Sequence, residues 1–535
     1  MEENDTLQAQ AHKLLGQKTQ TPQRYDNGFT KAMRSCCVIP QRYILGVMGL
    51  LGVCNAYTMR VCLNFAITQM VNKTKSASGY HYVDPDACPD DVIVANSSNI
   101  ATIIDKPYAI FDWDEKTQGL ILSGFYYGYA ATQVPGGYLA EKFGGKWTLG
   151  LGLLSTALFT FLTPFVIQIG GATWLFILRV LQGMGEGPTM PALMIMLARW
   201  VPPHERSFQG ALVFGGAQIG NIFGSFMSGI LLADGNWANV FYFFGGFGIL
   251  WFVLWSCFCF STPNSHPFIS DKELSYLNKT VTTAESHNVK DPVPWKGILL
   301  SAPVWALVWA AVGHDWGYYT MVTDLPKYSH DVLKYNIATT GYLTAIPYVA
   351  MWVFSFIFGF ICDLCIKKKW HSIKTGRIIY TTIAATGPAI CIILASYSGC
   401  DRNAAMAYFV LSMALMAGFY PGMKVNALDL APNYAGSLTS LVNTTSTFAG
   451  IITPYLIGLL TPDSTLAQWR VAFWVCFVVL VGTNVVYCIW ADGKQQWWDD
   501  VRQYGYPEGW KWGTLIRDTD PEHPETTALS EQKAG

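Results

Sequence analysis

Two opposite charges interrupt the apolar stretch LFILRVLQGMGEGPTMPALMIML at residues 175–197, namely Arg179 and Glu186. They lie seven positions apart, which at 100° per residue is about 700°, so the two side chains share one face of a helix. Their separation along the helix axis is roughly 10 Å, too far for an ion pair within one helix. Each charge therefore needs a partner elsewhere: water, a bound ligand or a residue on another helix.

Charged groups inside a bilayer usually face a cavity or a partner, because burying one costs roughly 2.5–3.5 kcal/mol on insertion scales. A carboxyl group in an apolar site takes up a proton more readily, so we expect Glu186 to bind and release a proton. Arg60, in RVCLNFAI, carries a guanidinium that suits carboxylate or phosphate in two-point contact, as does Arg179. The alternatives are a structural charge pair with other helices for Arg179 and Glu186, and an interfacial, snorkelling side chain for Arg60.

Glycine and proline surround the same two charges. Gly183 and Gly187 permit another helix to approach closely. Pro188 and Pro191 can break the helix and free carbonyl groups that line a cavity.

Other polar residues stand in apolar surroundings. His314, followed by Asp315, can change its charge near neutral pH, so it is a candidate for proton coupling or anion contact, or else a histidine at a helix end. Tyr126, Tyr127 and Tyr129 can offer hydroxyl groups to a polar cavity, although three such residues spread around a helix cannot all face it. We take Tyr127 as the substrate-binding candidate.

Further along the chain, Lys424 is expected to snorkel or to pair with Asp429. The polar patch 443–447 (NTTST) is expected to form hydrogen bonds across helices, with substrate or sodium binding as the alternative. The sequence contains no His or Cys cluster typical of a metal site, no GxxxxGK[ST] phosphate loop and no arrangement for nucleophilic catalysis. We therefore expect no metal, no cofactor and no enzyme activity.

The elements that position these residues are membrane-spanning helices. The chain of 535 residues is 51% hydrophobic and 13% charged, whereas soluble domains are about 25% charged. A net charge of -1 gives no electrostatic support for binding nucleic acid. Apolar runs of about 20 residues each fit spanning helices. We expect twelve of them, at 43–68, 117–140, 147–169, 173–197, 208–232, 238–260, 298–322, 338–361, 376–398, 403–424, 436–460 and 469–491.

This pattern predicts an all-α membrane protein of two six-helix halves. The expected parts are listed in chain order: an N-terminal tail 1–42, a first half 43–260 that includes a large loop 70–116, a central loop 261–297, a second half 298–491 and a C-terminal tail 492–535. Lysine and arginine gather in the loops on one side, which places both tails and the central loop in the cytoplasm. Asn72 and Asn96, in the acidic opposite loop, fit glycosylation acceptors.

A degraded repeat relates the two halves. GGYLAEKFGGKW at 136–147 and GFICDLCIKKKW at 359–370 both read glycine, an acid and a basic cluster, after the second helix of each half. Parallel halves of this kind are typical of major facilitator transporters. An acid at such a helix end can face a neighbouring helix N-terminus, so Glu141, Lys142 and Asp363 are candidates for gating, the alternative being that they only set topology.

Five stretches in matching order carry a family resemblance: RVCLNFAITQMVN (60–72), YGYAATQVPGGYLAEKFGGK (127–146), RVLQGMGEGPTMPA (179–192), WVPPHERS (200–207) and NALDLAPNYAGSL (426–438). Together they resemble the anion transporter family of sialin, the vesicular glutamate transporters and the type I sodium–phosphate cotransporters, within the major facilitator superfamily. GHDWGYYTMVTDLPKY (313–328) is most similar to insect members labelled inorganic phosphate cotransporters.

The resemblance implies coupled movement of organic carboxylates or phosphate. It implies substrate binding by Arg60, gating or anion contact by Arg179 and proton response by Glu186. His314 and Leu122 stand where glutamate-transporting members carry Arg and His, which points away from glutamate as substrate. We expect proton-coupled symport of small anions by alternating access. The alternatives are sodium-dependent phosphate cotransport and a membrane sensor that does not transport.

The remaining expectations concern partners and place. We expect a small anionic substrate and the lipid bilayer as partners, H⁺ or Na⁺ as the coupling ion, and a functional monomer. The expected location is the plasma membrane or a lysosomal or vesicular membrane.

Overall fold

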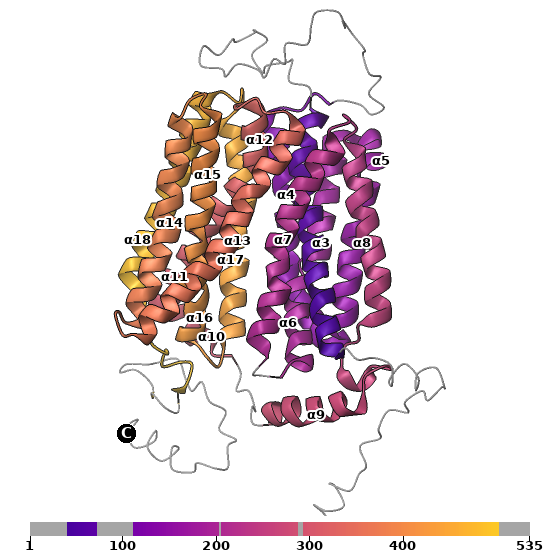
Figure 1. Cartoon of the computed structure of the whole chain (residues 1–535), viewed down its shortest axis with the longest axis vertical. Coiled ribbons are helices and arrows are strands. Elements are labelled where there is room, and N and C mark those ends of the chain that lie inside the picture. Colours follow the sequence, from indigo (N-terminus) through magenta and orange to yellow (C-terminus); the bar gives the residue numbers. More distant parts are fainter. Residues whose placement is uncertain (1–39, 72–110, 203–204, 287–292, 502–504, 506–535) are drawn as a thin grey trace, which may run out of the picture.

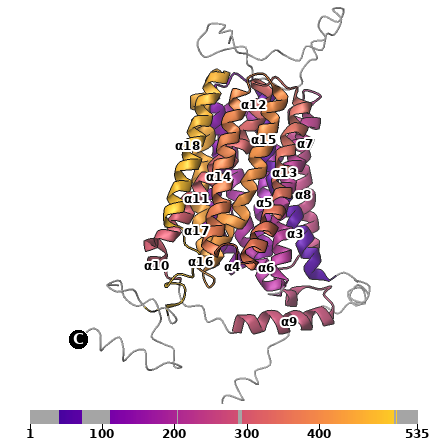
Figure 2. The same cartoon turned by 60° about the vertical axis from the view of Figure 1, so that its left-hand side comes forward.

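The computed structural model describes residues 40–71, 111–202, 205–286, 293–501 and 505. Within these ranges the regular elements are all helices, and turns and short irregular segments join them, with one isolated bridge between Val71 and Phe111. Figures 1 and 2 show two bundles side by side, one from the first half of the chain and one from the second. We call the end where α3 finishes and α4 begins the loop side. The opposite end, across which α9 lies, is the α9 side.

The first bundle is listed in chain order: α3 (Gln41–Met70), α4 (Glu115–Phe143), α5 (Gly145–Glu186), α6 (Thr189–Trp200), α7 (Arg206–Leu232) and α8 (Ala238–Phe258). Helix α5 has 42 residues and turns at Gly171, whose φ of 57° lies in the left-handed region that glycine adopts without strain. It therefore crosses the bundle twice, and α6 extends the second crossing after Pro188.

The second bundle begins with α11 (Ala302–Tyr319), the π-helical turn η2 (Thr320–Asp324) and α12 (Leu325–Asp331), which form one crossing. Its other elements are listed in chain order: α13 (Ile337–Lys367), α14 (Ile373–Tyr397), α15 (Arg402–Met416), η3 (Ala417–Phe419), η4 (Tyr420–Lys424), α16 (Val425–Leu430), α17 (Ala435–Leu460) and α18 (Leu466–Trp490). The connection between the bundles holds η1 (Pro263–Ser265), α9 (Asp271–Ser286) and α10 (Trp295–Leu300).

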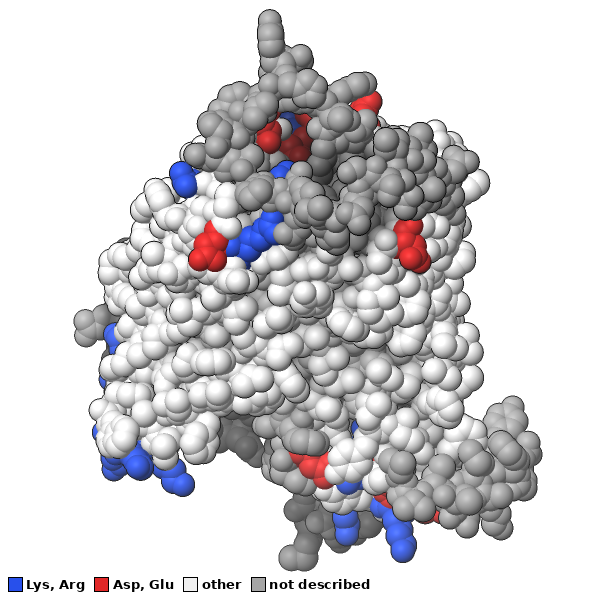
Figure 3. Space-filling view, turned by 45° about the horizontal axis from the view of Figure 1, so that its top comes forward, with Lys and Arg blue, Asp and Glu red and all other residues white. Residues whose placement is uncertain are grey.

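The described residues thus form twelve crossings in two sets of six, which confirms the predicted fold. Seven of the helices are long and apolar enough to span a membrane by length and composition alone. One of these seven, 145–200, is the double crossing. On the face that Figure 3 shows, a broad band that is almost free of charged side chains lies between two charged ends, as a bilayer requires.

Helix α9 is tied to the first bundle on the α9 side. Arg42 at the start of α3 donates from Nε to Glu205 at 2.9 Å and from Nη1 to Glu273 of α9 at 3.3 Å. The carboxylate of Glu273 also accepts the backbone N–H of Gln41 at 2.9 Å. The connecting helix is therefore anchored to the first half of the molecule.

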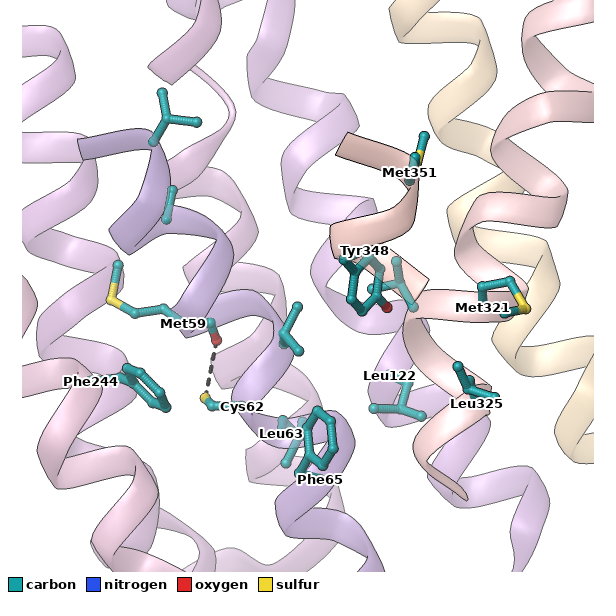
Figure 4. Close-up of a cluster of buried hydrophobic side chains, with 14 of the residues drawn as sticks. Met59, Cys62, Leu63, Phe65, Leu122, Phe244, Met321, Leu325, Tyr348 and Met351 are labelled. Atoms are coloured by element: carbon teal, nitrogen blue, oxygen red, sulfur yellow. Dashed lines mark hydrogen bonds between the residues drawn. The ribbon is translucent and has the colours of Figure 1, made fainter. Parts of the chain in front are cut away.

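The two halves meet closely on the loop side. Lys327 of α12 forms an ion pair with Glu115 of α4, and the amide of Asn64 in α3 donates to the carbonyl oxygen of Val322 at 2.9 Å. Buried apolar residues of both halves also belong to one cluster, among them Leu122, Leu325, Tyr348 and Met351. Figure 4 shows Leu122 of α4 among Leu325 and the α13 side chains of this cluster. The halves are thus joined by charge, hydrogen bonds and apolar packing on this side.

Candidate functional site

The charged partner of Glu186 lies on another helix. Its carboxylate forms an ion pair with the guanidinium of Arg60 on α3, and the residues are 1% and 4% exposed. Arg179 and Glu186 do not pair with each other, as the helical spacing predicted. The structure therefore brings together three of the predicted residues, and the pair it forms is the one between Arg60 and Glu186.

Glycine allows the helices around this pair to lie very close. A Cβ atom on Gly183 of α5 would overlap the carbonyl oxygen of Phe125 in α4. Just beyond Glu186 the helix breaks at Gly187 and Pro188 and restarts at Thr189. The expected close approach and helix break are both present, with the break at Pro188. The carboxylate consequently lies at a helix end inside the bundle.

Three aromatic rings surround the guanidinium of Arg60. Its Cζ atom lies 4.5 Å from the ring centre of Tyr57, 4.8 Å from that of Phe125 and 4.8 Å from that of Tyr129. Phe125 also faces Arg179, whose Cζ lies 5.1 Å from its ring centre. Ring faces attract cations, and more strongly where water is excluded, so this cage stabilises two guanidinium groups without neutralising them.

Arg179 has neutral partners only among the described residues. It donates to the side-chain oxygen of Gln182 at 3.1 Å and to the carbonyl oxygen of Arg60 at 3.4 Å. Gln182 in turn donates to the hydroxyl of Thr160 at 3.2 Å. Arg179 is 3% exposed, so its charge is held by dipoles and by Phe125.

The cluster therefore has two cations and one carboxylate. Three of its buried atoms lack a hydrogen-bond partner among the described residues: Nε of Arg60, Nε of Arg179 and Oε2 of Glu186. Buried charged groups normally satisfy their hydrogen-bonding capacity. A site with an excess positive charge and free donors is suited to a small anion, provided that Arg60 can be released from Glu186.

Tyr127 lies away from this cluster. Its side chain is 46% exposed and its ring packs against Phe176 at 6.2 Å between centres. The neighbouring tyrosines face inward instead: Tyr129 contacts Arg60, and Tyr126 packs against Tyr319 of the second half. This placement gives no support for a contact between Tyr127 and an anion bound at Arg60.

His314 lies inside the second half. Its Nδ1 is 3.1 Å from a carboxylate oxygen of Asp315, and its ring stacks on Phe419 with centres 3.6 Å apart. A small cavity beside it is lined only by residues of the second half, including Thr381 and Asn484. The structure does not bring His314 into the cluster of Arg60, Arg179 and Glu186.

Lys424 has a different partner from the one expected. Its ammonium donates to the side-chain oxygen of Asn443 on α17 at 3.1 Å. Asp429 is held by Arg377 instead, through contacts of 2.7 and 3.4 Å, so the expected pairing of Lys424 with Asp429 is wrong. Lys424 belongs to the π-helical turn η4 and is partly exposed although it lies within a spanning segment. The signal that marks it in the sequence is a cation within an apolar run.

The polar patch 443–447 contributes hydrogen bonds across helices, as predicted. Besides the contact of Asn443 with Lys424, the hydroxyl of Thr444 donates to Gln133 of α4 at 3.0 Å. Two further hydrogen bonds link α7 to the second half, from Gln218 to Tyr420 at 3.3 Å and from Asn221 to Tyr318 at 2.7 Å. A layer of uncharged polar groups therefore lies between the halves.

The gating candidates lie on the α9 side. Lys142, near the end of α4, and Asp363, near the end of α13, have exposed side chains. Glu141 belongs to α4, but its side chain is outside the described part of the structure. Their gating role stays a prediction. Asn72 and Asn96, the glycosylation candidates, also lie outside the described residues.

Comparison with known proteins gives consistent results. The model of the Major Facilitator Superfamily matches residues 49–454. A "Putative inorganic phosphate cotransporter" of Drosophila melanogaster is 38% identical over 466 residues, covering 86% of this chain and 86% of its own length. Sialin of Homo sapiens is 36% identical over 464 residues, covering 86% and 91%. Vesicular glutamate transporter 2 of Homo sapiens is 30% identical over 474 residues, covering 88% and 77%.

Two solved structures share the fold at low sequence identity. A D-xylose–proton symporter superposes with a TM-score of 0.59 at 13% identity, covering 84% of this chain and 98% of its own. A bacterial homolog to the human lysosomal transporter Spinster, in an inward-facing and unoccupied conformation, superposes with a TM-score of 0.62 at 13% identity, covering 84% and 97%.

Proposed function

Since the chain belongs to the major facilitator superfamily, in the group of sialin, the vesicular glutamate transporters and the insect phosphate cotransporters, we propose that it transports small anions by alternating access, driven by protons. The observation that carries this proposal is the buried ion pair of Arg60 and Glu186 beside the unneutralised Arg179. An excess positive charge at this depth is costly unless a partner compensates it, and a bound anion would do so.

Proton coupling follows from competition for one guanidinium. While Glu186 is ionised, its carboxylate occupies Arg60. A proton that binds to this carboxylate removes its charge, weakens the ion pair and frees the guanidinium for an anion. Loss of the proton restores the pair and expels the anion. Proton and anion are thereby bound together and released together, which is the requirement for symport.

In this proposal Lys424 is the residue of the second half that contacts the anion, opposite Arg60 and Arg179 of the first half. Its ammonium is held by the neutral Asn443 and is partly exposed, so it can contact an anion without first breaking an ion pair. Arg60 and Arg179 would hold the anion from one half and Lys424 from the other. Substrate sites of such transporters lie between the halves near the midplane, and an anion held by both halves would favour their closing around it.

Sodium-dependent phosphate cotransport is the second candidate. The name of the Drosophila melanogaster relative, which is 38% identical, favours phosphate as the substrate and names no coupling ion. Phosphate and carboxylate are both bound in two-point contact by guanidinium groups, so the cluster fits either anion.

The side of the membrane follows from charge. We propose that the α9 side, where lysines and arginines gather, is cytoplasmic together with both tails. The loop side then faces the exterior or the lumen of a lysosome or vesicle. We also propose that one chain is the functional unit, since the twelve crossings contain the whole cluster.

The test is uptake into liposomes that contain the purified protein. Phosphate, sialate, glutamate and urate are offered under an imposed pH gradient without sodium, and under a sodium gradient without a pH difference. We expect one or more of these anions to accumulate against its gradient when protons are the only driving ion. Accumulation only with sodium would establish the second candidate, and no flux of any anion would contradict the proposed function.

A further inference from the structure

A second buried carboxyl group lies between the anion cluster and the loop side. Asp324 ends the π-helical turn η2 and is 3% exposed. In the part of the chain that the structure describes, its Oδ2 lies 2.6 Å from the hydroxyl oxygen of Thr323, and no cation lies at ion-pair distance. An isolated carboxylate inside a membrane protein is costly, so such a group is either paired or neutral.

The cations nearby are already engaged. Four elements pack against the turn: α3, α11, α12 and α17. Tyr126 of α4 and Cys476 of α18 interact electrostatically with Asp324, and Lys327 follows it by three residues on α12. Tyr126 and Tyr319 interact in turn with Arg60 of α3. Of the two cations, Arg60 is held by Glu186 and Lys327 by Glu115. Neither is available to compensate a charge on Asp324.

Hydrogen-bond geometry points to a neutral Asp324. The hydroxyl oxygen of Thr323 lies 2.7 Å from the carbonyl oxygen of Tyr319 and 2.6 Å from Oδ2 of Asp324. A hydroxyl group has one proton, so it can donate to only one of these two acceptors. If Asp324 carries a proton, it donates to Thr323, which then donates to Tyr319, and both short contacts are satisfied.

The position of Asp324 links this proton to closure of the loop side. Val322, two residues earlier, accepts the hydrogen bond from Asn64 of the first half, and Lys327, three residues later, forms the ion pair with Glu115. Leu325, the next residue, belongs to the apolar cluster between the halves (Figure 4). The turn that contains Asp324 is therefore part of the closed contact.

We propose that Asp324 is a proton-binding site whose occupancy is required for the loop side to close. When the halves part there, water reaches the carboxylate and its proton can leave to the loop-side solution. Before they close, one proton returns from that solution to a carboxylate oxygen. This proton is not carried across the membrane. Acid on the loop side therefore favours the closed state, separately from the proton on Glu186. The inference rests on the proposed function only in assuming that the loop side opens.

The test measures opening of the loop side without any substrate. Spin labels are attached to cysteines at Asp234 and Asn403, exposed residues of the two halves on the loop side, after the native exposed cysteines have been replaced. Glu186 is kept in all samples, so that Arg60 stays paired and cannot compensate a charge on Asp324. Distances between the labels are measured from acid to alkaline pH, with and without Asp324→Asn.

We expect the ratio of open to closed molecules to rise with pH by up to about tenfold per pH unit, the slope for one proton. Adding Asp324→Asn should keep the loop side closed and remove this response. An unchanged pH response after this substitution would overturn the proposal. Because no anion is present, failure of the proposed transport function would leave this test intact.

A second measurement does not depend on a variant that folds. Infrared spectra of the purified protein with isotope-labelled aspartate should show the carbonyl band of a protonated aspartic acid at neutral pH. Absence of this band would contradict the proposal. Loss of the band on adding sodium would also overturn it, because the site would then hold a metal cation in place of the proton.

Discussion

The substitution Glu186→Gln separates anion binding from proton control. An anion on Arg60 would lie about 6 Å from the displaced carboxylate of Glu186, and at an effective dielectric constant of about 20 their repulsion is on the order of 3 kcal/mol. The neutral amide removes this repulsion and the competing ion pair, so we expect the variant to bind anions roughly a hundredfold more tightly than the wild type at alkaline pH. At acid pH, where the wild type is protonated at Glu186, the two proteins should bind equally.

The assay is equilibrium binding of the anion transported best, to purified protein in lipid nanodiscs, across a range of pH. Affinity of the wild type should rise as pH falls, whereas affinity of the variant should stay flat. Glu273→Gln is the matched control, because Glu273 also contacts an arginine, Arg42, at 3.3 Å but on the α9 side, and it should behave like the wild type. If Glu186→Gln binds with the wild-type affinity and pH dependence, the competition between carboxylate and anion is refuted.

Three further predictions concern anion binding by Arg60, helix packing at Gly183 and the ion pair on the loop side. Arg60→Lys should weaken anion binding by about 1.5–3 kcal/mol, because an ammonium loses the two-point contact; wild-type affinity of the purified variant would speak against a role for Arg60. Gly183→Ala should lower the free energy of unfolding by about 1–3 kcal/mol through overlap with Phe125, and an unchanged thermal midpoint in detergent would show that the helices separate without cost. Glu115→Lys or Lys327→Glu should open the loop side to a membrane-impermeant thiol reagent at an introduced cysteine, whereas the double exchange should restore protection if the ion pair acts as a unit.

The membrane crossings, and the lack of contact between Arg179 and Glu186, could be predicted from the sequence. Apolar runs of sufficient length mark the spans, and helical periodicity alone excludes an ion pair between Arg179 and Glu186. The glycines at 183 and 187 also indicated the close helix approach that the structure contains. These features depend on local geometry, which periodicity describes well.

The sequence could not predict which residues of different helices contact one another. Successive residues of a helix point about 100° apart, so the sequence cannot tell which of Tyr126, Tyr127 and Tyr129 faces inward before the rotation of α4 is known. Lys424 and Asp429 are close in sequence, yet the π-helical turn η4 and Arg377 of α14 assign them different partners. Asp324 falls two residues beyond the expected span 298–322, so its burial and the engagement of the nearby cations become visible only in the structure.

Coupling between proton and anion is the central claim. It is tested most directly by comparing proton-driven accumulation of the anion with the exchange of anion for anion. Liposomes containing wild type or Glu186→Gln are loaded with the transported anion for exchange, or left empty under an inward proton gradient for accumulation. We expect the wild type to do both, and Glu186→Gln to exchange anion for anion while failing to accumulate it. Full proton-driven accumulation by Glu186→Gln would contradict the account.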